Sequence, residues 1–113
     1  MRKILIAEDN VEISDMMKSY LVKAGYEVCQ AFDGFEALAM AKEIKPDLAL
    51  LDIMMPKIDG FEVCQTLRKT MTMPIIVVSA KVAEEDKVRM FDLGADDYIT
   101  KPFSFKEMVV RVA

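Results

Sequence analysis

Carboxylates stand directly after two apolar runs of this sequence. The run "KILIA" (3–7) is followed by Glu8 and Asp9, and the run "LALL" (48–51) is followed by Asp52. A charge at the end of a buried strand costs free energy unless it is paired or binds an ion. Carboxylate oxygens suit Mg²⁺ or Mn²⁺, and a carboxylate beside such an ion can attack phosphorus. The three acids are therefore candidates for a metal site with a nucleophile.

Two further polar residues follow apolar runs in the same way. Ser79 comes after "PIIVV" (74–78), and Lys101 comes after "DYIT" (97–100). Three carboxylates with one ammonium leave a surplus of about −2, which disfavours joint ionisation unless a cation is present. During phosphoryl transfer to Asp52, the metal and Lys101 would offset the charge on the phosphoryl oxygens, and Ser79 would donate a hydrogen bond to one of them.

The composition excludes several other classes of function. The chain has 113 residues, of which 53% are hydrophobic, so it suits one domain with a core. No apolar run approaches the roughly 20 residues that a membrane span needs. The net charge is −4 and no basic stripe is present, so this segment is not expected to bind DNA itself. The absence of histidine removes His-based catalysis and most zinc sites. Cys29 and Cys64 are interpreted as reduced thiols of a cytoplasmic protein.

Short apolar runs alternate with segments of helical period. Strands are expected at 3–7, 26–31, 47–51, 74–78 and 97–100. The first helix is predicted from a stripe that ends before Gly25: Ile13, Met16, Met17, Tyr20, Leu21 and Ala24. Acidic or hydroxyl residues with Glu three positions on predict three more helix starts, at Asp33, Asp59 and Ser104. A further helix is expected over 83–94, with acids in its first turn.

This alternation predicts an α/β fold, a doubly wound five-stranded parallel sheet of the flavodoxin-like type. Continuous apolar strands indicate that both faces of the sheet are covered. The order 2-1-3-4-5 is favoured because the strand at 26–31 is the most polar and suits an edge. In such sheets ligands bind at the carboxyl ends of the strands, where the order reverses between strands 1 and 3. The carboxylates, Ser79 and Lys101 should therefore converge.

With these residues in place, the chain resembles the receiver domain of two-component response regulators along its whole length. The matching segments are "ILIAEDN", "LALLDIMMPKIDGFE", "IIVVSA" and "GADDYITKPF". The resemblance is strongest to the OmpR/PhoB class, whose members join a receiver to a winged-helix DNA-binding domain. It implies a CheY-like switch that accepts a phosphoryl group from a sensor histidine kinase, a signalling module rather than a metabolic enzyme.

The resemblance also implies roles for individual residues. Asp52 would be the phosphoacceptor. Mg²⁺ or Mn²⁺ would be held by Asp9, Asp52 and the backbone carbonyl of Met54, with Glu8 acting partly through water. Lys101 would pair with the phosphoryl group, and the Lys101-Pro102 bond would be cis.

Ser79 and Tyr98 would form the switch pair, in which movement of Ser79 frees space for Tyr98 to turn inward. Without the resemblance, Tyr98 would be interpreted as an ordinary half-buried aromatic residue of a strand. In the OmpR/PhoB class, phosphorylation promotes a homodimer. That analogy implies contacts of Lys87 with Glu107 and of Asp97 with Arg111 across a two-fold axis, beside Val88 and Phe91. The plainer interpretation of these charges is a solvated face.

Three alternative functions share part of this pattern. A stand-alone or phosphorelay receiver would act by protein contact, and the reading frame beyond residue 113 separates it from a DNA-binding regulator. A haloacid-dehalogenase-type phosphatase would need an Asp where Met54 stands. A flavin-binding relative would need a glycine- and hydroxyl-rich phosphate loop after the first strand. Because the last helix still shows its apolar period at Val112, residues 1–113 are expected to be a trimmed receiver from a longer, DNA-binding protein.

Overall fold

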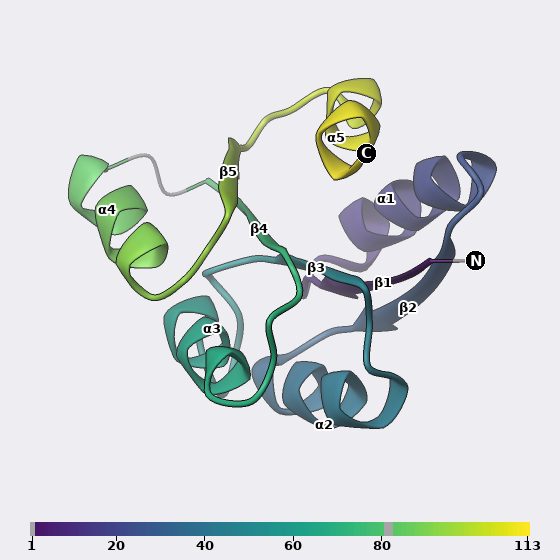
Figure 1. Ribbon diagram of the computed structural model, residues 1–113. Coiled ribbons are helices and arrows are strands. Elements are labelled where there is room, and N and C mark those ends of the chain that lie inside the picture. The colour runs from purple at the N-terminus through teal and green to yellow at the C-terminus, as the bar shows by residue number, and fades with distance from the viewer. Residues whose placement is uncertain (1, 81–82) are drawn as a thin grey trace.

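The sheet has the predicted parallel architecture and strand order. The computed structural model describes residues 2–80 and 83–113. Its five strands are all paired in parallel, in the order β2-β1-β3-β4-β5 (Figure 1). They are β1 (Lys3–Ala7), β2 (Glu27–Ala31), β3 (Leu48–Leu51), β4 (Ile75–Ser79) and β5 (Asp97–Thr100). The order reverses between β1 and β3, so ligands are expected at the carboxyl ends of these two strands.

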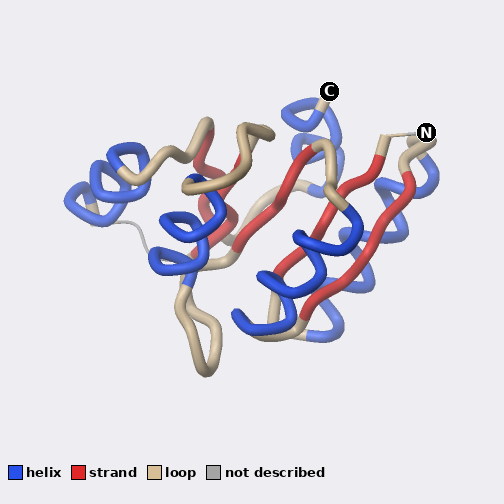
Figure 2. Tube along the Cα trace, turned by 60° about the horizontal axis from the view of Figure 1, so that its bottom comes forward, coloured by secondary structure: helices blue, strands red, loops and turns tan. Residues whose placement is uncertain are grey.

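Helices cover both faces of the sheet (Figures 1 and 2). They are α1 (Val11–Lys23), α2 (Gly34–Ile44), α3 (Gly60–Arg68), α4 (Glu84–Asp92) and α5 (Phe105–Val112). Along β1, Ile4 and Ile6 pack with α1 and α5, whereas Leu5 and Ala7 pack with α2 and α3. This alternation explains why the strand is apolar at nearly every position.

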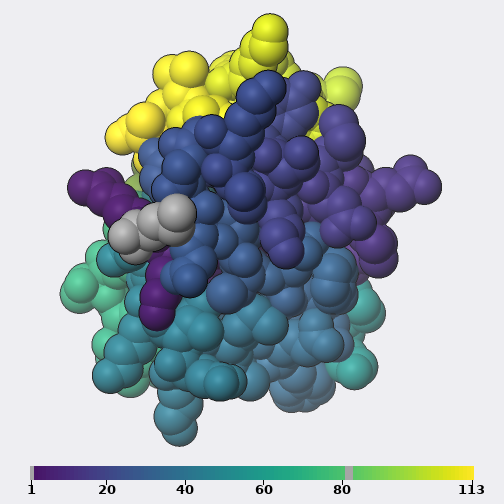
Figure 3. Space-filling view, turned by 90° about the vertical axis from the view of Figure 1, so that its right-hand side faces the viewer, coloured from purple at the N-terminus to yellow at the C-terminus, as the bar shows by residue number. Residues whose placement is uncertain are grey.

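The first helix packs against the last one. Figure 3 shows the yellow surface of α5 adjoining the dark blue surface of α1. The rings of Tyr20 and Phe105 stack between the two helices, with centroids 5.3 Å apart. The chain that leaves β5 is thereby held close to α1, and this placement matters because Lys101 lies in that chain.

Side-chain caps fix three helix starts as the sequence predicts. Asp33 Oδ1 accepts from Glu36 N at 2.8 Å, Asp59 Oδ1 accepts from Glu62 N at 3.0 Å, and Ser104 Oγ accepts from Glu107 N at 3.3 Å. Such caps contribute about 1 kcal/mol each. They fix the residue at which each of these helices begins after the carboxyl end of the preceding strand.

The predicted apolar stripe of α1 is wrong at two positions, because Met16 and the C-cap residue Ala24 are both exposed. Met16 is 46% exposed, whereas Ser14 is fully buried. Gln30 of β2 donates a hydrogen bond to Ser14 Oγ at 2.9 Å, so a polar pair occupies the contact between α1 and the edge strand.

Within the described residues, no helix is both long and apolar enough to span a membrane.

Candidate functional site

Two carboxylates are fixed at the point where the strand order reverses. Glu8 and Asp52 directly follow β1 and β3. Glu8 N donates to Ala31 O at 3.0 Å, and Asp52 N donates to Ala7 O at 2.9 Å, so the backbone of both residues is bonded to a neighbouring strand. The side chains are consequently held at the carboxyl edge of the sheet, as predicted.

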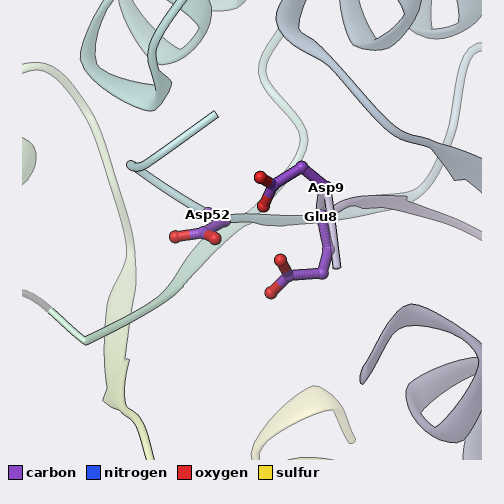
Figure 4. Close-up of side chains that lie close together, drawn as sticks. All are labelled: Glu8, Asp9 and Asp52. Atoms are coloured by element: carbon purple, nitrogen blue, oxygen red, sulfur yellow. The ribbon is translucent and has the colours of Figure 1, made fainter. Parts of the chain in front are cut away.

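The third predicted acid joins them. One carboxylate oxygen from each of Glu8, Asp9 and Asp52 lies within 4.8 Å of the others. Figure 4 shows the three carboxylates converging from the ends of the two strands. Glu8 is 1% exposed and Asp52 is 4% exposed, whereas Asp9 faces solvent. The cluster thus has two buried members and one accessible member.

Lys101 supplies the positive charge that the sequence predicts. Its ammonium donates to Glu8 Oε1 and, at 3.2 Å, to Asp52 Oδ2. Its backbone N–H donates to Ser79 O at 2.9 Å, which ties the residue to the end of β4. The Lys101-Pro102 peptide bond is cis, as the resemblance implies.

Burial and the neighbouring charged groups shift the pKa values of two side chains in the site. Burial raises the pKa of Glu8 to about 7, although hydrogen bonds from Lys101 and from the backbone of Asn10 oppose this change. Burial would lower the pKa of Lys101, but its hydrogen bond with Glu8 and the charge of Asp52 raise it overall. The ammonium therefore stays charged. One ammonium does not balance three carboxylates, so a bound cation would stabilise the cluster.

The chain beyond Asp52 turns back against the strand end. Met54 N donates to Asp52 Oδ1 at 3.2 Å, and Met54 is 56% exposed. A Cβ atom on Gly60 would collide with the backbone carbonyl of Asp52, so glycine permits α3 to begin this close to the acid. This contact was not predicted from the sequence, although the Asp-Gly pair at 59–60 was visible there.

Ser79 and Tyr98 form a contact pair. Ser79 is the last residue of β4, rather than the residue after it, and is fully buried. Burial raises the pKa of the Tyr98 phenol, and a side-chain hydrogen bond with Ser79 opposes that shift. Lys87 Nζ lies 5.4 Å from the centroid of the tyrosine ring. The tyrosine already reaches towards Ser79 in this structure, and the predicted switching motion stays a prediction.

Three of the four charges of the predicted dimer surface are paired with one another within the chain, while the Lys87 ammonium lies over the ring of Tyr98. Arg111 Nη1 lies 2.9 Å from Asp97 Oδ2, and Arg111 Nε lies 3.3 Å from Glu107 Oε1. Val88 and Phe91 are 51% and 47% exposed on α4. Their contacts with a second copy of the chain therefore stay a prediction, as does the exchange of ion pairs across a two-fold axis.

The fold is a doubly wound α/β sheet with an acidic cluster at the point where its strand order reverses, and comparison with known proteins gives the family. A family model of the response regulator receiver domain matches residues 4–113. This chain belongs to that family. It is a receiver domain of two-component signalling, regulated by phosphorylation, and the phosphodonor partner of such a domain is a histidine kinase.

Several solved structures are similar along nearly their whole length. The Francisella response regulator 1452 receiver domain is 37% identical, with a TM-score of 0.94 over 99% of this chain and 93% of that one. The BeF3-activated N-terminal receiver domain of Klebsiella pneumoniae RstA is 32% identical, with a TM-score of 0.93 over 98% and 95%. The Vibrio cholerae chemotaxis protein CheY4 is 32% identical, with a TM-score of 0.94 over 99% and 96%.

Proposed function

We propose that Asp52 is the phosphoacceptor of this receiver domain. One observation carries the assignment: the Asp52 carboxylate, on a side chain that is 5% exposed, lies 3.2 Å from the Lys101 ammonium and clusters with the carboxylates of Glu8 and Asp9. In the transfer, an oxygen of ionised Asp52 forms a bond to phosphorus. The bond from phosphorus to the donor's leaving atom breaks, and its electron pair stays on the leaving group. The chain would catalyse only its own phosphorylation and dephosphorylation.

The acidic cluster fits the Mg²⁺ that receiver domains bind. Glu8, Asp9 and Asp52 offer hard oxygen donors, with the backbone carbonyl of Met54 as a further candidate, and such donors suit Mg²⁺ and also Mn²⁺. A bound ion would supply positive charge opposite the phosphoryl oxygens. Lys101 holds a second positive charge beside Asp52, and Ser79 lies buried at the end of the neighbouring strand.

Labelling with a small phosphodonor tests this function without the cognate kinase. Acetyl phosphate with Mg²⁺ should add one phosphoryl group per chain, measured as intact mass. An excess of EDTA should prevent the addition, because carboxylates alone repel the incoming phosphate. Incorporation at the same rate with and without metal would refute the proposed role of the cluster.

Ser79 should couple the phosphoryl group to Tyr98. A phosphoryl group brings close to two negative charges and three acceptors, and the Ser79 hydroxyl that bonds Tyr98 lies at the same edge. Ser79→Ala should still be phosphorylated, but the NMR shifts around Tyr98 should respond to phosphorylation less than in the wild type. An undiminished response in the variant would refute this route, since a ligand shifts an equilibrium only through contacts that differ between states.

For the output, we propose the OmpR/PhoB class, in which phosphorylation drives homodimerisation and a separate domain binds DNA. The support is the segment resemblance and the exposure of apolar residues on α4 and α5, with Val110 73% exposed. The similar RstA structure is itself an activated N-terminal receiver domain. The alternative is a receiver that acts through protein contacts without DNA output.

Light scattering on a protein in which this receiver precedes its output domain should show a dimer after complete phosphorylation. Phe91→Ala should weaken that dimer, because Phe91 is 47% exposed on the proposed surface. Phe35→Ala is the matched control, since Phe35 is 58% exposed but lies on α2. A mass that stays monomeric at full phosphorylation, or equal weakening by both variants, would contradict the proposed surface.

A further inference from the structure

The loop between β3 and α3, residues 53–59, leads directly from Asp52 and contains Met54. Its base is closed by main-chain hydrogen bonds, because Ile53 O accepts from Met55 N at 3.1 Å and from Gly60 N at 2.8 Å. These bonds join the two ends of the loop to each other but do not tie the loop to α2. They leave the position of its tip, residues 56–58, to be set by other contacts.

The tip rests on the first turn of α2. Lys57 Nζ lies 3.2 Å from Asp33 Oδ2. A Cβ atom on Gly34 would collide with the backbone carbonyl of Ile58, so the loop main chain lies directly on the start of the helix. An ion pair and a backbone contact, from adjacent residues, thus join the loop to α2.

Asp33 is well placed to hold the loop rigidly. Its Oδ1 accepts from Glu36 N at 2.8 Å as the cap of α2, while its Oδ2 faces Lys57. The Asp33 side chain is only 14% exposed, so its orientation is fixed by the helix. The lysine therefore meets a carboxylate that is already in place.

Lys57 occupies a backbone conformation that lysine rarely adopts. Its φ is +72°, in the left-handed region that Gly and Asn enter more readily. Its ammonium is largely solvated, with 59% of the side chain exposed, and exposed ion pairs contribute little to global stability. The pair is thus better suited to choosing one position of the loop than to stabilising the whole fold.

We propose that Lys57 and Asp33 are positioning residues for the metal site: their ion pair holds the β3–α3 loop on α2 and so sets the main chain of Met54 relative to Asp52. This inference rests on the proposed Mg²⁺ site. Without the pair, the loop would populate other positions. The apparent dissociation constant for Mg²⁺ would then equal the intrinsic one divided by the fraction of molecules in the binding position. Given the small strength of exposed pairs, we expect a two- to five-fold weakening, roughly.

The test compares two variants that remove opposite charges and keep the backbone. Lys57→Asn suits a positive φ, and Asp33→Asn retains the helix cap. Mg²⁺ dissociation constants are measured by titration without phosphodonor. If the two charges acted only through their distant fields, Lys57→Asn would bind Mg²⁺ more tightly and Asp33→Asn less tightly. Positioning predicts that both variants bind less tightly, and that the double variant is no weaker than either single one.

A second lysine with positive φ provides a matched control. Lys45 has a φ of +49° and caps the far end of α2, so Lys45→Asn should leave the dissociation constant unchanged. Tighter or unchanged binding in Lys57→Asn would overturn the inference while wild-type binding still supports the proposed site. Absence of Mg²⁺ binding by the wild type would instead refute the proposed function, so the two failures are distinguishable.

Discussion

Asp52→Asn should abolish incorporation of a phosphoryl group from acetyl phosphate and Mg²⁺. An amide has no ionised oxygen to attack phosphorus, so the loss should be complete and not partial. The side chain remains able to accept a hydrogen bond from Lys101, which lies 3.2 Å from Asp52 Oδ2, so the fold should persist. Intact mass spectrometry measures the incorporation, and circular dichroism checks the fold.

Asp59→Asn is the control for this variant. Asp59 is a nearby exposed acid that caps α3, and Asn caps a helix equally well. It should be phosphorylated as the wild type is. Full labelling of Asp52→Asn, or loss of labelling in Asp59→Asn, would show that the nucleophile has been assigned to the wrong residue.

Asp9→Ala should weaken Mg²⁺ binding by at least about tenfold. Asp9 is the accessible carboxylate of the three, and its removal would take a proposed direct ligand from the cluster. Loss of groups that merely support ligands already costs about 10–100-fold in metal affinity, so loss of a ligand should cost no less. The dissociation constant is measured by titration of the unphosphorylated protein.

Glu12→Ala separates metal binding from the simpler role of acids near a helix start. Glu12 is also exposed and lies in the first turn of α1, where a negative charge interacts favourably with the helix dipole. Its removal should leave Mg²⁺ affinity nearly unchanged. An equal effect of both substitutions would mean that Asp9 contributes only general negative charge.

The strands could be predicted, with their carboxyl ends correct to within one residue, because the signals are local. Continuous apolar runs define β1, β3 and β4, and the residue after each run is fixed by counting. Parallel pairing brings the carboxyl ends of all the strands, including β5, to one edge of the sheet. Glu8, Asp52 and Lys101 could therefore be placed together from the sequence. Asp-x-x-Glu and Ser-x-x-Glu spacing located three helix starts in the same way.

Contacts that depend on the path of a loop or on how a helix packs could not be predicted. The ion pair of Lys57 with Asp33 depends on the path of a loop, and the sequence indicated Asp33 only as a helix cap. The burial of Ser14 in place of Met16 depends on Gln30 of the edge strand. The pairing of Arg111 with Asp97 inside one chain likewise depends on how α5 leaves β5. The apolar period of a helix or strand does not indicate which polar residue of another segment its side chains will contact.

Chemical mapping of the phosphorylated residue tests the central claim most directly. An aspartyl phosphate is an acyl phosphate, so hydroxylamine should attack its carbonyl carbon, release phosphate and leave a hydroxamate on the same side chain. After labelling and hydroxylamine treatment, peptide mass spectrometry should find that hydroxamate on Asp52. A hydroxamate on another carboxylate, such as Asp9 or Asp59, or a phosphoryl group that resists hydroxylamine, would contradict the account.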